Sequence, residues 1–178
     1  AVLTAKILST IDVLSGGRLT MGIGAGWMRE EFEAIDAPDF DARGTVTDEY
    51  VRAFVELWTS DAPKFDGKHV RFSNIGFEPK PVQKPHPPVY QATISPESFE
   101  QAARAGINLQ MASPFTYRTY REKWMDELEK NCQHYDKVCR DLGGDPKKAE
   151  RMLLLPFFVH EDGKKAREIY KAHVEWFY

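Results

Sequence analysis

The sequence RLTMGIGAG at residues 18–26 decides how the chain is expected to fold. Its apolar run is typical of a short buried strand, and its three glycines predict a tight turn where that strand ends. A helical spacing of apolar residues over positions 1–14 precedes it and stops at Ser15-Gly16-Gly17. Further helices are expected after it, at Met28–Ile35 and Thr45–Trp58. A strand enclosed between helices indicates an α/β protein.

The rest of the chain continues this alternation. Further strands are predicted at Val89–Thr93, Asn108–Ala112 and Met152–Val159, and further helices at Pro96–Gly106, Tyr117–Leu142 and Lys164–Tyr178. Between the helix at Thr45–Trp58 and the strand at Val89–Thr93, residues at about 60–88 form an irregular excursion. The excursion holds a small hairpin over Lys64–Phe72 that turns at Asp66-Gly67, followed by a run of five prolines that enforces an extended path.

Strands that alternate with helices imply parallel pairing through right-handed crossovers. Both a TIM-type (β/α)8 barrel and an open doubly wound sheet satisfy this pattern. A complete barrel takes roughly 250 residues and eight strands, whereas this chain has 178 residues and only four predicted strands. The barrel interpretation therefore expects residues 1–178 to be a fragment of one barrel domain, with further sequence on both sides.

Composition argues against several classes of protein. Hydrophobic residues make up 42% of the chain, too many for a disordered protein, and the net charge of −3 comes from acidic and basic residues that are mixed along it. No basic stripe suggests a nucleic-acid partner, and no apolar run of about 20 residues suggests a membrane span. With no secretion signal, we expect a cytoplasmic protein whose Cys132 and Cys139 are free thiols.

The glycines at positions 22, 24 and 26 would let the backbone approach a bound ligand closely. A dinucleotide-binding fingerprint is one interpretation. However, the third glycine arrives one residue early, and no second strand that ends in an acidic residue follows about 20 positions later. A glycine-rich barrel strand with little room for side chains is the simpler interpretation.

The segment Ser95-Pro96-Glu97-Ser98 follows a predicted strand and opens a helix. Hydroxyls and unpaired backbone N–H groups at a helix start bind phosphate well, and the carboxyl ends of parallel strands are where ligands bind. The same four residues can also be a capped helix and nothing more.

Arg43 stands in the loop just ahead of the helix that begins near Thr45. Its guanidinium can grip a phosphate, or it can pair at the surface with one of the aspartates at positions 39, 41 and 48. The five histidines show no metal-binding spacing, and no nucleophile elbow is present, so neither a metal site nor a nucleophilic serine is expected.

These patterns occur in the order and spacing of one family. The sequence resembles the bacterial-luciferase-like flavin monooxygenases along nearly its whole length, and the ordered set of motifs is more specific than any one of them. The motifs are LSGGRLTMGIGAGW (residues 14–27), Glu30-Glu31-Phe32, Asp48-Glu49-Tyr50, Leu57-Trp58, PKPVQKPHPPV (residues 79–89) and Ser95-Pro96-Glu97-Ser98.

The resemblance implies that the chain spans helix three through helix seven of a TIM-type barrel, with about four of its eight strands. It implies reduced FMN as the cofactor, whose phosphate is held by Arg43, Ser95 and Ser98 and whose ring lies beside Gly24-Ala25-Gly26. It also implies flavin hydroperoxide chemistry with molecular oxygen on a small organic substrate, a separate flavin reductase, and a homodimer to which the first helix contributes.

Departures from the family pattern limit these expectations. Bacterial luciferase carries a cysteine and an arginine at the positions of Gly24 and Ala25, so a second phosphate cation and light emission are not expected here. Phe115 follows the third predicted strand and is a candidate substrate contact near the flavin. The family's catalytic histidine belongs to an earlier strand, so no catalytic residue is named. A deazaflavin-dependent dehydrogenase on the same barrel and a flavin-binding relative without turnover remain alternatives.

Overall fold

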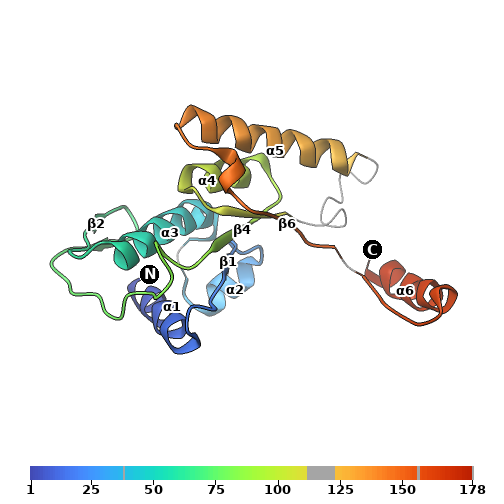
Figure 1. Cartoon of the computed structure of the whole chain (residues 1–178), viewed down its shortest axis with the longest axis horizontal. Helices are drawn as coiled ribbons and strands as arrows, with labels where there is room; N and C mark the ends of the chain where they lie inside the picture. Colours follow the sequence, from blue (N-terminus) through green and yellow to red (C-terminus); the bar gives the residue numbers. More distant parts are fainter. Residues whose placement is uncertain (38, 112–122, 156, 178) are drawn as a thin grey trace.

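The computed structural model describes residues 1–37, 39–111, 123–155 and 157–177, and its main sheet contains four parallel strands. The strands are β1 (Met21–Ile23), β4 (Val89–Thr93), β5 (Asn108–Met111) and β6 (Arg151–Leu153), and they lie side by side in that order (Figure 1). The order of the strands in the sheet is the same as their order in the chain, so each strand is added at the same edge of the sheet. Each crossover between two neighbouring strands contains at least one helix.

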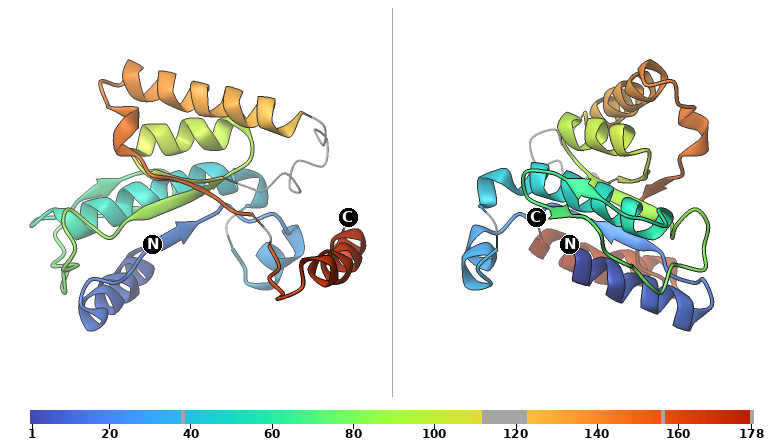
Figure 2. Two further views of the ribbon diagram at one scale, coloured as in Figure 1. Left: turned by 45° about the vertical axis from the view of Figure 1, so that its right-hand side comes forward. Right: turned by 90° about the vertical axis from the view of Figure 1, so that its left-hand side faces the viewer.

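Helices cover one face of this sheet. They are α3 (Arg43–Thr59), α4 (Pro96–Ala105) and α5 (Trp124–Asp141), stacked on the same side (Figure 2). Strand residues that face them, such as Val89 and Leu109, are buried. In the described part of the chain the opposite face is open, and Ala92 and Met152 are exposed on it. A doubly wound sheet has helices on both faces and a reversal of strand order, so the arrangement favours an arc of a barrel.

The remaining helices of the described residues are α1 (Val2–Ser15), α2 (Arg29–Ala34) and α6 (Gly163–Phe177), with short 3-10 turns at η1 (Phe40–Ala42) and η3 (Pro146–Lys148). None of the described helices has the length and apolarity needed to cross a bilayer. Both cysteines are free, as predicted.

Most predicted boundaries agree with the structure to within two residues. The strand expected to reach Val159 instead ends at Leu153. The neighbouring strand β5 ends at Met111, which pairs with Leu153. Residues after Leu153 therefore have no described strand residue with which to continue the ladder. The first part of the helix expected at Tyr117–Leu142 lies outside the described residues.

Most of the large apolar residues of α1 face away from the core, although Ala5 is buried in it and Leu8 packs against it. The buried side of the helix includes Ser9 and Asp12, whereas Leu3 is 73% exposed and Leu14 is 82% exposed. The Asp12 carboxylate accepts hydrogen bonds from the backbone N–H of Gln83 at 3.1 Å and from the Gln83 side-chain amide at 2.7 Å. The helix therefore attaches to the excursion through polar contacts and leaves an apolar stripe on its outer side.

A buried carboxylate on α3 anchors the hairpin of the excursion. The predicted hairpin is confirmed, because β2 (Phe65–Asp66) pairs antiparallel with β3 (Arg71–Phe72). Between these strands, the backbone N–H groups of residues 68, 69 and 70 donate to the Glu49 carboxylate at 2.9, 2.8 and 3.1 Å. Burial acts to raise the pKa of Glu49, but these three N–H groups outweigh it and hold the pKa below its ordinary value.

The ammonium group of Lys80 caps the C-terminal end of α3. Its Nζ donates to the carbonyl oxygens of Leu57 at 2.7 Å and Ser60 at 2.5 Å, where a helix ends with unpaired carbonyls and partial negative charge. We expect Lys80→Met to lower the free energy of unfolding by about 1–2 kcal/mol, because two charge-assisted hydrogen bonds are lost.

Urea denaturation measures the effect of Lys80→Met. Lys84→Met is a suitable control, because Lys84 lies in the same segment, is exposed, and has no partner among the described residues. Equal decreases in the free energy of unfolding for Lys80→Met and Lys84→Met would contradict the capping role of Lys80.

Candidate functional site

The glycine-rich turn and the serine turn lie at the same edge of the sheet. β1 and β4 are adjacent and parallel, so Gly24-Ala25-Gly26 and Ser95–Ser98 both follow carboxyl ends of neighbouring strands (Figure 1). The helices that begin there also touch, because a Cβ added at Gly44 would lie 3.3 Å from the side-chain nitrogen of Gln101. The start of α3 thus lies beside the middle of α4, and α4 begins directly after β4 at the edge where parallel α/β proteins bind ligands.

Arg43 is the first residue of α3 rather than a member of the preceding loop. Its Nε donates to the carbonyl oxygen of Gly26 at 3.1 Å, and its Nη1 donates to that of Phe40 at 2.9 Å. Its guanidinium carbon lies 3.9 Å from the centroid of the Phe40 ring. A guanidinium carries five N–H groups, so these contacts fix the side chain and leave other donors open.

The aspartates that were candidate partners of Arg43 are engaged elsewhere. Asp41 pairs with Arg29 at 2.7 Å, and Asp48 pairs with Arg52 at 2.9 Å. Asp39 accepts the backbone N–H of Asp41 at 3.0 Å. Within the described residues, Arg43 therefore has no carboxylate partner. An oriented guanidinium with open donors and no counter-ion is what an anion site requires.

Of the three positions in the glycine-rich turn, Gly26 has the clearest need for glycine. Its φ is +84°, and a Cβ would lie 2.7 Å from the ring of Phe32 on α2. At Gly24, a Cβ would meet Ala92 at an ordinary 3.8 Å. The glycine at position 26 therefore allows α2 to pack against the turn, and Phe32 in turn meets the Phe40 ring edge-on at 5.1 Å.

The two serines make their contacts within their own turn. The Ser98 hydroxyl donates to the Ser95 carbonyl oxygen at 2.6 Å and accepts the backbone N–H of Ile94 at 3.0 Å. Ser95 occupies the N-cap position, but its hydroxyl makes no capping bond to the helix backbone. Instead, the Ser95 hydroxyl beside Glu97 lowers the pKa of that carboxyl group. Glu97 thus supplies the negative charge at the start of α4.

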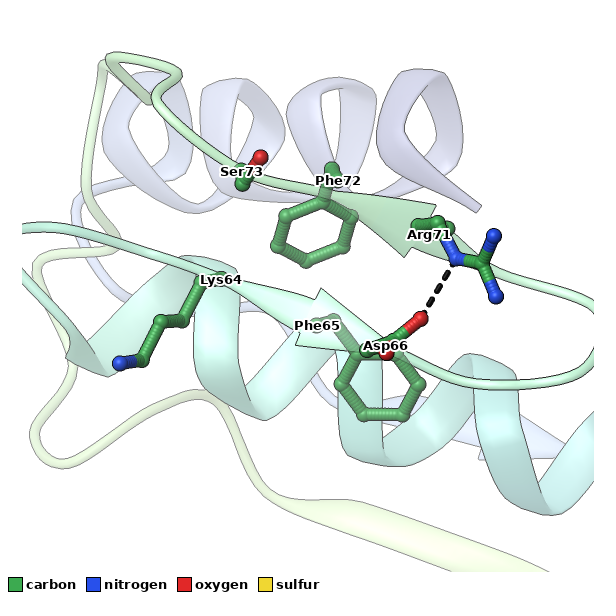
Figure 3. Close-up of a pocket in the computed structure, with 6 residues that line it drawn as sticks. All are labelled: Lys64, Phe65, Asp66, Arg71, Phe72 and Ser73. Carbon is green, nitrogen blue, oxygen red and sulfur yellow. Dashed lines mark hydrogen bonds and ion pairs between the residues drawn. The ribbon is translucent and has the colours of Figure 1, made fainter.

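A surface hollow lies at the hairpin, away from the carboxyl ends of the strands of the main sheet. It is lined by Lys64, Phe65, Asp66, Arg71, Phe72 and Ser73 (Figure 3). Arg71 and Asp66 already pair with each other at 2.5 Å, so we do not place the functional site there. Phe115 lies outside the described residues. Within the described ranges, no three His, Cys, Asp or Glu side chains are grouped to hold a metal.

The whole chain, residues 1–178, matches the family described as luciferase-like monooxygenase. An FMNH2-dependent dimethylsulfone monooxygenase of Pseudomonas putida is 38% identical over 104 residues, which are 57% of this chain and 29% of that protein. The oxygenase component of a flavin-dependent trigonelline monooxygenase of Acinetobacter baylyi is 30% identical over 158 residues, which are 88% of this chain and 41% of that protein. The crystal structure of monooxygenase RslO1 from Streptomyces bottropensis superposes with a TM-score of 0.83 at 27% identity, over 99% of this chain and 51% of its own.

Similarity also extends to proteins that use another cofactor. An F420-dependent glucose-6-phosphate dehydrogenase of Amycolatopsis mediterranei is 26% identical over 166 residues, which are 92% of this chain and 47% of that protein. In each of these alignments the chain spans about half of the relative's length or less. The match over the full sequence confirms the resemblance, and the parallel strands in chain order agree with a partial barrel. This chain belongs to the luciferase-like monooxygenase family.

Proposed function

We propose that the protein is an oxygenase that takes reduced FMN from a separate flavin reductase and oxidises a small organic substrate with molecular oxygen. Two relatives support this, because one is named for FMNH2 and the other is the oxygenase component of a flavin-dependent system. The structural observation that carries the proposal is Arg43, whose guanidinium is fixed by two carbonyl groups and has no carboxylate partner in the described chain.

In this proposal, each predicted cofactor-binding residue has a binding role. The Arg43 guanidinium binds the FMN phosphate through the N–H groups that it does not use internally. Gly24-Ala25-Gly26 lies beside the flavin ring, where small residues let the backbone come close. The hydroxyls of Ser95 and Ser98 turn from their present partners toward the phosphate. Reduced flavin supplies the electrons that activate oxygen, and the protein holds the phosphate and excludes water.

A deazaflavin-dependent dehydrogenase is the second candidate, because an F420-dependent dehydrogenase is also similar to this chain. Anaerobic titration of the purified protein with reduced FMN and with reduced F420 separates the two. Oxygen uptake is then followed with dimethylsulfone or trigonelline as first substrates. We expect preferential binding of FMN and substrate-dependent oxygen uptake.

Two other results would refute the proposed activity. Preference for F420 without oxygen uptake identifies the dehydrogenase. Tight binding of FMN without uptake for any substrate of a broad panel identifies a flavin-binding relative without turnover.

We also propose that α1 contributes to a homodimer. Its outer stripe consists of Leu3, Ile7, Ile11 and Leu14, each at least 44% exposed. We expect Ile7→Lys to weaken dimerisation by about ten-fold or more, because it places a charge in an apolar contact. Sedimentation equilibrium measures this, with Lys6→Gln as the control, since Lys6 is exposed and lies outside the stripe. An unchanged association constant for Ile7→Lys would exclude α1 from the interface.

A further inference from the structure

A second guanidinium shares the ring on which Arg43 lies. Arg29 is the first residue of α2, and its guanidinium carbon lies 4.6 Å from the centroid of the Phe40 ring. The guanidinium carbon of Arg43 lies 3.9 Å from the same centroid. The two positive charges are therefore no farther apart than the sum of these two distances. The cluster sits next to Gly26, whose carbonyl oxygen accepts from Arg43.

The charges of this cluster do not balance. The negative face of an aromatic ring attracts each cation, but the two cations repel one another. Asp41 pairs with Arg29, and in the described chain no other carboxylate lies within ion-pair distance of either arginine. One positive charge thus remains without a counter-ion beside the glycine-rich turn, and a dianion such as a phosphate monoester would complement the pair.

The ion pair between Arg29 and Asp41 is easy to exchange. The side chains of Arg29 and Asp41 are 49% and 71% exposed, and a pair this accessible to water contributes little to stability. Asp41 lies in the short turn η1, between Phe40 and Arg43 in sequence. A bound phosphate can therefore replace the Asp41 carboxylate on Arg29 at small cost.

We propose that Arg29 is a second cation of the phosphate site, held on the Phe40 ring by Asp41 until the flavin phosphate takes the place of that carboxylate. The inference rests on the proposed function, since it concerns the same phosphate. The glycine-rich turn itself offers no cationic side chain, because Ala25 stands between Gly24 and Gly26. Arg29 supplies this charge from the start of α2 instead.

The test compares the Kd values of oxidised FMN and of riboflavin, which lacks the phosphate, by fluorescence titration of the purified protein. We expect Arg29→Gln to weaken FMN binding by about five-fold and Asp41→Asn to tighten it by about three-fold, with riboflavin unchanged in both. The double variant R29Q/D41N should behave like Arg29→Gln alone, because the effect of Asp41 acts through Arg29.

Arg52→Gln is the matched control. Arg52 is also an exposed arginine that pairs with an aspartate, Asp48, and lies over a phenylalanine ring, Phe65 at 5.6 Å, but it belongs to the middle of α3. The variant Arg52→Gln should leave the Kd values of both FMN and riboflavin unchanged. An effect of Arg52→Gln equal to that of Arg29→Gln would reduce the inference to a general charge effect and overturn it.

The outcomes distinguish this inference from the proposed function. If Arg29→Gln leaves the ratio of the two Kd values unchanged while Arg43→Gln shifts it, the second cation is wrong and the phosphate site stands. If neither variant shifts the ratio, the phosphate site itself is wrong, and the inference fails with it. If Asp41→Asn fails to tighten FMN binding, Asp41 is not the group that the phosphate replaces.

Discussion

Arg43→Gln is expected to weaken the binding of FMN by about 100-fold and to change the binding of riboflavin by less than about two-fold. The two flavins share the ring and differ in the phosphate, so the ratio of their Kd values isolates the phosphate contact. A guanidinium bound to a dianion contributes roughly 2–3 kcal/mol through charge-assisted hydrogen bonds, whereas glutamine offers only a neutral amide. Fluorescence titration at low ionic strength measures both constants with the least screening.

The structural contacts of Arg43 must be separated from its effect on binding. Its guanidinium donates to the carbonyl oxygens of Gly26 and Phe40, so a variant can loosen the turn without any ligand contact. Arg43→Lys keeps the charge but loses the planar fork, and we expect an intermediate loss of about ten-fold. Equal losses for FMN and riboflavin would assign Arg43 a structural role and remove the main support for the proposed function.

Glycine and proline made much of the fold predictable from the sequence. The strand at Val89–Thr93 directly follows the proline run, and Pro96 begins the next helix, as the structure has them. A hairpin in this stretch was also predictable, because an Asp-Gly pair is typical of one. The turn itself lies one residue later than predicted, at residues 67–70, because Asp66 pairs with Arg71 as part of β2. The structure adds a physical reason: a side chain at Gly67 would collide with the Glu49 carboxylate. Local backbone constraints of this kind do not depend on distant parts of the chain.

The partners of the charged residues could not be predicted in this way. Spacing placed Arg43 among three aspartates, but tertiary placement gives Asp41 to Arg29. Asp48 pairs with Arg52 one turn further along the same helix. The apolar spacing of α1 predicted a helix correctly, yet the side that faces the core follows from Asp12 and its partner 71 residues away. The expected hydroxyl donors of the serine turn are used within that turn. The contacts of Asp41 and Asp12 depend on which segments meet in space, and hydrophobic periodicity carries no information about them.

Glu49→Ala is expected to lower the free energy of unfolding by about 3 kcal/mol, because three backbone N–H groups of residues 68–70 lose a buried charged acceptor. For Glu49→Gln we expect about 2 kcal/mol, since the amide keeps one oxygen but turns its NH2 group against a backbone N–H. Urea denaturation near neutral pH measures both. Glu56→Gln is the matched control on the same helix, because Glu56 accepts only one backbone N–H, that of Lys64 at 3.1 Å. We expect it to lose less than about 1 kcal/mol.

The contribution of Glu49 should also depend on pH with a defined sign. Burial alone would raise its pKa, but the three N–H groups hold the folded pKa below the unfolded value, which is about 4.3. The stabilisation is therefore fully present above the unfolded pKa and is lost as the pH falls through the folded one. The difference in unfolding free energy between the native protein and Glu49→Gln should be constant from roughly pH 6 to pH 8 and shrink below about pH 4. A difference that persists unchanged at about pH 2 would mean that the shape of residue 49, and not its charge, anchors the hairpin.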